Sequence, residues 1–89
     1  MTSSEIATAV REYLEANLLY MRPGFSLGDT TRLLEERVVD SIGVMEVIAF
    51  LEDRFAIAIR DDEVTEANLG SIAAMARFVA TKLGQVRAA

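Results

Sequence analysis

The chain of 89 residues contains no cysteine, no histidine and no tryptophan, and it has a single proline. Without cysteine it can form no disulfide, thiolate metal site or thiol nucleophile. Without histidine it has no Ser-His-Asp triad, no imidazole base and no imidazole metal ligand. Lys82 is the one amine side chain that could act as a nucleophile. We therefore expect neither an enzyme nor a metal-binding protein.

Long apolar runs are also missing. The longest stretch without a charged residue is the ten residues 67–76, about half of what a membrane span requires. No basic segment leads into an apolar one near the N-terminus, so a signal peptide is not expected. These features predict no membrane span, a cytoplasmic location and a monomer.

Basic residues are outnumbered by acidic ones, nine against fourteen, which gives a net charge of −5. Residues 40–66 hold eight acidic and two basic residues and alone carry −6. Such a surface repels phosphate, so nucleic acid is not an expected partner. Basic protein surfaces are the expected partners instead, and salt should weaken the attraction to them.

The hydrophobic fraction of 52% is enough for a packed core in one domain, residues 1–89. A capping box at Thr2 and Glu5 opens a predicted helix over 3–18. A long loop, 19–40, follows because Pro23, Gly24 and Gly28 break regular structure. Four apolar residues of this loop are expected to pin it to the core: Phe25, Leu27, Leu33 and Leu34.

Two further long helices and one short helix complete the predicted all-α four-helix bundle. Asp40 and Ser41 suit the start of a helix over 41–55, since either side chain can cap it. The alternating segment 56–59 could pass for a strand, but no partner strand is apparent, so we interpret it as a loop with two apolar anchors. A short helix is predicted over 61–66, and a last helix over 71–83, with Gly84 as its stop.

The sequence Asp40-Ser41-Ile42 and the acidic amphipathic stretch after it resemble the acyl carrier protein family, including peptidyl and aminoacyl carriers. The attachment motif of that family is Asp-Ser-Leu. Glu46, Glu52 and Phe55 fall at the family's spacing without a gap. The resemblance covers the whole chain, although the first helix and the long loop match in pattern more than in letters.

The resemblance implies that a phosphopantetheinyl transferase moves 4′-phosphopantetheine from coenzyme A onto Ser41, beside Asp40. The thiol of that arm would carry an acyl or aminoacyl group as a thioester, received from a loading ligase and passed to downstream enzymes. The placement is physically favourable, because a phosphate at a helix N-terminus gains ~0.3–1 kcal/mol from the helix dipole.

The resemblance also implies that the helix over 41–55 is the surface that partner enzymes recognise. The residues that would face a partner are Ile42, Met45, Glu46, Ala49, Glu52 and Asp53. An alternative stays open at this point, in which Met45 and Ala49 fill the core and the acidic residues only solvate the helix.

Three departures from the family pattern favour a dedicated carrier of a specialised pathway, such as polyketide, nonribosomal peptide or aminoacyl transfer. Gly43 stands where fatty acid carriers usually have an acidic residue, Arg37 stands near a position that is often glycine, and Arg60 replaces a frequent proline. The sequence does not identify the cargo, and as a guess five apolar residues could line a pocket for it: Val44, Ile48, Leu51, Ile59 and Met75.

Two other functions compete with the carrier. One is an unmodified helical interaction module that binds a basic partner surface through its acidic second helix. The other is a small hydrolase with Ser41 as nucleophile, which is disfavoured because no base accompanies the serine. Calcium binding at residues 61–63 is equally disfavoured, because the spaced loop with its glycine is missing.

Overall fold

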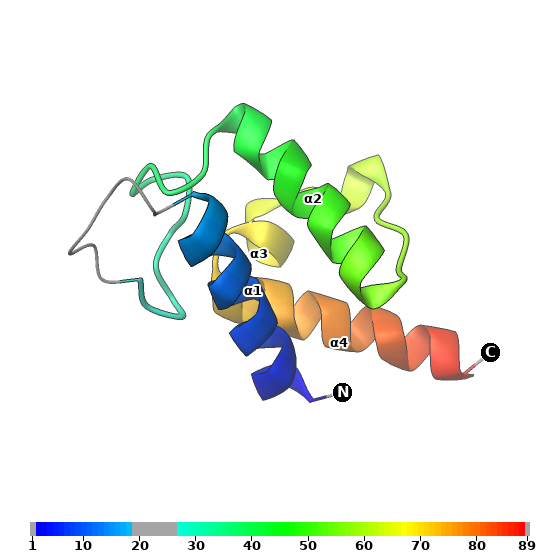
Figure 1. Ribbon diagram of the computed structural model, residues 1–89. Helices are drawn as coiled ribbons and strands as arrows, with labels where there is room; N and C mark the ends of the chain where they lie inside the picture. Colours follow the sequence, from blue (N-terminus) through cyan, green and yellow to red (C-terminus); the bar gives the residue numbers. More distant parts are fainter. Residues whose placement is uncertain (1, 19–26, 89) are drawn as a thin grey trace.

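The computed structural model describes residues 2–18 and 27–88, and within them it contains helices and no strand. In chain order these are α1 (Ser3–Asn17), α2 (Ser41–Phe55), the 3-10 turn η1 (Asp61–Glu63), α3 (Glu66–Leu69) and α4 (Ile72–Ala88). Figure 1 shows α4 crossing α1, and the C-terminal end of α2 lying close to α4. Three longer helices, a short third helix and a long first connection confirm the predicted four-helix bundle.

The core consists of the apolar faces that the helical periodicity predicts. On α1 the buried side chains are Ile6, Val10 and Leu14, and on α2 they include Val47, Leu51 and Phe55. The buried residues of α4 include Ile72, Met75, Ala76 and Val79. Tyr13 of α1 also stacks on Phe50 of α2, with ring centroids 4.2 Å apart and planes 9° from parallel. These contacts gather α1, α2 and α4 around one hydrophobic core.

The start of α1 and the segment after α2 both agree with the sequence predictions. Thr2 accepts a hydrogen bond from the Glu5 amide at 3.2 Å, and the Glu5 carboxylate accepts one from the Thr2 amide at 3.4 Å. This is the predicted capping box. After α2, Ile57 is buried and Ile59 is half-buried, so the alternating segment is an anchored loop, as predicted.

The described part of the long connection is fastened at several points. The Arg11 guanidinium of α1 donates to the Leu27 carbonyl and pairs with Asp29. The Leu33 amide donates to the Gly70 carbonyl at 2.9 Å, and the Ala73 amide donates to the Asp29 carbonyl at 2.9 Å. These bonds join the connection to α1, to the end of α3 and to the start of α4.

Leu27 and Leu33 are buried, as expected, but the Leu34 side chain is 53% exposed. The expectation that Leu34 pins the connection to the core is therefore wrong. Phe25, the fourth expected anchor, lies outside the described residues.

Two helix boundaries differ from those predicted. The segment predicted as one helix over 61–66 is divided, because Thr65 accepts a hydrogen bond from the Asn68 amide at 3.2 Å and so starts a new helix, α3. The last helix does not stop at Gly84 but continues to Ala88. A Cβ built on Gly84 meets nothing within 4 Å, so nothing around this glycine requires the helix to end.

Ala56 ends α2 with a left-handed backbone, at φ 54° and ψ 46°. A Cβ is strained in this region and glycine is not, so Ala56→Gly is expected to raise the free energy of unfolding by about 0.5–1 kcal/mol. Urea unfolding checks this. The control is Ala58→Gly, because Ala58 does not have a positive φ; this variant should gain nothing. Equal effects at the two positions would contradict the strain argument.

Candidate functional site

Ser41 is the first residue of α2, and its side chain is exposed. The cap of this helix is Asp40, whose carboxylate accepts a hydrogen bond from the Gly43 amide at 2.6 Å. The sequence allowed either side chain to cap the helix, and the structure assigns the cap to Asp40. The Ser41 hydroxyl is therefore not needed to start the helix and is available at its N-terminal end.

A second serine shows the opposite arrangement. Ser71 immediately precedes α4, and its hydroxyl accepts a hydrogen bond from the Ala74 amide at 3.1 Å. This serine is half-buried and satisfies a backbone donor of the first turn of α4. Of these two serines, Ser71 satisfies a backbone donor at a helix start and Ser41 does not.

The turn before Asp40 is compact and fixes the position of Ser41. The amides of Val38 and Val39 both donate to the Leu33 carbonyl, at 2.9 and 3.1 Å, and both side chains are buried. Arg37 takes a left-handed φ of 59° within this turn, the conformation that would favour a glycine near this position. Asp40 and Ser41 therefore follow directly from a buried anchor.

Gly43 is buried in the first turn of α2, and its small size has a structural reason. A Cβ at this position would lie 3.1 Å from Val39 Cγ1 and 3.2 Å from the Asp40 carboxylate oxygen that caps the helix. A larger side chain would crowd both. The missing acidic residue at position 43 thus follows from the close approach of the preceding turn to α2.

An apolar cavity of about 120 Å³ lies between α2, α3 and the connection that precedes α2. Val39 and Val44, which line it, are two residues before and three residues after Ser41, so the cavity adjoins the start of α2. Of the five residues guessed from the sequence, Val44 and Met75 line the cavity, whereas Ile48, Leu51 and Ile59 do not. The full lining is Leu33, Leu34, Val39, Val44, Val47, Val64, Thr65, Glu66, Leu69, Gly70 and Met75.

The outward face of α2 contains five of the six residues expected to face a partner. The side chains of Ile42 and Met45 are 73% and 65% exposed. Ala49 is also exposed, so neither Met45 nor Ala49 is a core residue. Glu46 and Asp53 are exposed on the same helix. Apolar side chains flanked by carboxylates are thus presented to solvent beside Ser41.

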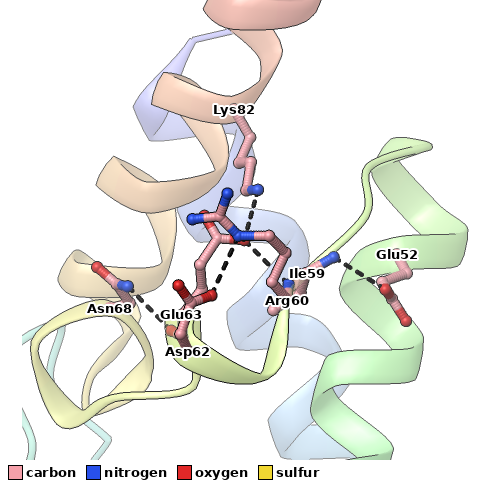
Figure 2. Close-up of polar contacts among 7 residues, drawn as sticks. All are labelled: Glu52, Ile59, Arg60, Asp62, Glu63, Asn68 and Lys82. Carbon is pink, nitrogen blue, oxygen red and sulfur yellow. Dashed lines mark hydrogen bonds and ion pairs between the residues drawn. The ribbon is translucent and has the colours of Figure 1, made fainter.

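Glu52 differs from the other five residues. It is half-buried, and its Oε2 accepts a hydrogen bond from the Ile59 amide at 2.9 Å, which ties the loop after α2 back to the helix (Figure 2). One carboxylate oxygen of Glu52 is therefore already used within the fold. Sequence patterns do not predict this bond, because residues seven apart across a helix end have no fixed geometry.

A polar cluster joins η1 to α4, and Glu63 is at its centre (Figure 2). Glu63 Oε1 accepts hydrogen bonds from Lys82 Nζ at 2.6 Å and from the Arg60 amide at 2.9 Å. Asn68 Nδ2 donates to the Glu63 carbonyl at 2.9 Å. The Lys82 ammonium is thus held in an ion pair, which argues against its use as a nucleophile. Sequence reasoning missed this pair, because its members lie on separate elements.

The hydrogen bond from Lys82, followed by that from the Arg60 amide, lowers the pKa of Glu63 below its ordinary value of 4.5. A lowered pKa in the folded state contributes stability above the ordinary value, and this contribution is lost as the pH falls through the lowered one. We expect wild type to be more stable than Glu63→Gln at neutral pH, with the difference shrinking below pH 4.5. Urea unfolding across this range measures it, and a difference independent of pH would contradict it.

The described residues contain no group of three or more acidic side chains placed to hold a metal ion. None of the helices in this part of the chain has the length and apolar character needed to cross a bilayer. What the structure does offer is an exposed hydroxyl at a helix N-terminus, an apolar cavity beside it and an outward face of mixed apolar and acidic residues. An arm attached through a phosphodiester fits here, because the helix N-terminus favours the phosphate.

Comparison with known proteins agrees with this geometry. The model of the family described as phosphopantetheine attachment site matches residues 4–79. No curated protein matches the chain. The matched range covers most of the chain and includes α2, α3 and the cavity between them. The chain therefore belongs to the phosphopantetheine attachment family, whose members are carrier proteins rather than enzymes and bear 4′-phosphopantetheine covalently on a serine.

Proposed function

We propose that Ser41 is the serine that bears 4′-phosphopantetheine and that the chain carries an acyl or aminoacyl group for partner enzymes. The observation that supports this most directly is the exposed Ser41 hydroxyl at the first position of α2, with Asp40 already supplying the cap. When attached, the arm supplies the thiol that this cysteine-free chain lacks. The chain presents the Ser41 hydroxyl to solvent, and the hydrogen bond between the Gly43 amide and the Asp40 carboxylate does not involve it.

The outward face of α2 is the proposed docking surface. Ile42 and Met45 offer apolar contact close to the attachment point, and Glu46 and Asp53 offer charge to Lys or Arg on a partner. Burial, together with the negative charge of Glu46, raises the pKa of Tyr13. Glu52 can contribute its remaining oxygen. Proposed partners are a phosphopantetheinyl transferase, a loading ligase and downstream acyl-processing enzymes.

The cavity between α2 and α3 supports an apolar cargo. Its lining is almost entirely aliphatic, and Glu66, the charged member, is paired with Arg32. A small apolar acyl group could shelter there, whereas a charged aminoacyl group would lose hydration without gaining a partner. The first turn of α2 offers no carboxylate to a partner, and this consequence of the packing at Gly43 is why we propose a specialised pathway over bulk fatty acid synthesis.

Incubation with coenzyme A and a broad-specificity phosphopantetheinyl transferase tests the proposal. Intact mass spectrometry should show one added arm, and peptide mapping should place it on Ser41. A reaction without transferase is the control. A folded chain that never gains the arm would overturn the assignment.

The unmodified interaction module remains the competing function, because the exposed Ile42 and Met45 beside carboxylates would suit a partner with or without an arm. Two results together would favour it. Protein purified from its natural host would carry no arm, and partner binding would be unchanged in Ser41→Ala.

A further inference from the structure

Residues 58–68, which include η1 and most of α3, form one wall of the cavity, and none of them is buried. Val64, Thr65 and Glu66 of this cavity wall line the cavity. The nearest buried residues are Ile57 before it and Leu69 after it. Ile59, at its start, is half-buried against the core. The rest of the segment gains little from hydrophobic contact, so polar contacts with neighbouring elements contribute most to holding it in place.

Three such contacts reach outside the cavity wall. The Ile59 amide donates to Glu52 of α2 at 2.9 Å. Glu66 pairs with Arg32 at 2.7 Å, but these side chains are 60% and 63% exposed, and water screens such a pair strongly. Glu63 pairs with Lys82 of α4 at 2.6 Å, and these side chains are only 16% and 15% exposed. The Glu63–Lys82 pair is thus the least screened ion pair between the wall and the rest of the fold.

Glu63 also organises the wall itself. The oxygen that accepts from Lys82 accepts from the Arg60 amide as well, which closes η1. The Glu63 carbonyl accepts from the side chain of Asn68 in α3 at 2.9 Å. Glu63 therefore connects Lys82 of α4 to both η1 and α3.

We propose that the Glu63–Lys82 ion pair is a latch that holds the cavity wall against α4 and controls entry of the carried group into the cavity. Only the second half of this statement rests on the proposed function. When the pair separates, the wall keeps its bonds to Glu52 and Arg32 but loses its ion pair with α4. The cavity then opens on the side lined by Val64, Thr65 and Glu66.

Hydrogen exchange on the chain without any arm tests the latch by itself. Lys82→Met keeps an unbranched apolar side chain and removes the ammonium group, which also lies 5.7 Å from the centroid of the Phe78 ring. We expect the amides of Val64, Leu69 and Gly70, which donate within the wall and at its end, to exchange about tenfold faster. The amides in the middle of α1 should be unchanged, which separates local release from global unfolding.

Two further variants make the test specific. Arg60→Met removes a cation whose main partner, Asp62, belongs to the same wall, so exchange should stay at the wild-type rate. The double variant E63Q/K82M should exchange no faster than Lys82→Met, because both changes break one interaction. Wild-type exchange rates in Lys82→Met, or an equal acceleration in Arg60→Met, would overturn the latch.

A loaded form tests the control of entry. The transferase can attach the arm with a hexanoyl group from hexanoyl coenzyme A, and neutral hydroxylamine then cleaves the exposed thioester. We expect cleavage at least about threefold faster in Lys82→Met than in wild type, because the opened cavity protects the group less. Equal rates would overturn the control of entry. Failure to load either protein would instead count against the proposed function, and the exchange measurement would still decide on the latch.

Discussion

Ser41→Ala is expected to lose the whole mass increase that wild type gains from coenzyme A and the transferase. The substitution removes the only hydroxyl that the proposal allows as acceptor. Its effect on the free energy of unfolding should stay within about 0.5 kcal/mol, because Ser41 is exposed and the helix cap belongs to Asp40. Intact mass spectrometry and urea unfolding of the same preparation measure both quantities.

Ser71→Ala is the matched control, and its expected behaviour is the reverse. Loss of the hydroxyl that accepts from the Ala74 amide should cost about 1 kcal/mol of stability. The mass increase should remain complete. Retention of the arm by Ser41→Ala, or its loss in Ser71→Ala while the chain is folded, would contradict the assignment of Ser41.

Gly70→Ala is expected to destabilise the chain by about 1–3 kcal/mol, because the new Cβ has no room. It would lie 2.5 Å from the Glu66 carbonyl oxygen and 2.6 Å from Glu66 Cγ. Glu66 belongs to α3 and lines the cavity, so the strain must be relieved by moving the short helix. Urea unfolding should show the loss of stability, and the amides of α3 should exchange faster.

Gly84→Ala provides the comparison for this prediction. Gly84 lies inside α4, and a Cβ there meets nothing within 4 Å. Alanine should therefore stabilise the helix by about 0.5–1 kcal/mol. A destabilising effect at Gly84, or none at Gly70, would show that the surroundings of these glycines do not decide the outcome.

The parts of the fold that follow local rules could be predicted from the sequence. The capping box at Thr2 and the apolar face of α1 depend only on residues within a few positions of each other. The start of α2 at Ser41 and the buried Ile57 in the following loop also depend on neighbours in the chain. The proposed attachment site could be predicted because Asp40-Ser41-Ile42 is a local motif.

The features that were missed depend on contacts between distant segments. Leu34 is apolar like Leu33 and lines the same cavity, but it is 53% exposed whereas Leu33 is buried. Nothing near Lys82 in the sequence indicates that Glu63 receives its ammonium group. Gly84 predicts a helix stop because glycine often ends helices, yet α4 continues through it to Ala88.

Asp40 caps α2 and Ser41 does not, and this affects how the forms of the protein with and without the arm can be distinguished. Esterification of the Ser41 oxygen breaks no bond on which α2 depends, since the carboxylate next to it keeps the Gly43 amide. The forms with and without the arm should accordingly share the same backbone at the start of α2. An enzyme that must distinguish these forms therefore has to contact the arm itself, because the backbone around Ser41 is the same in both.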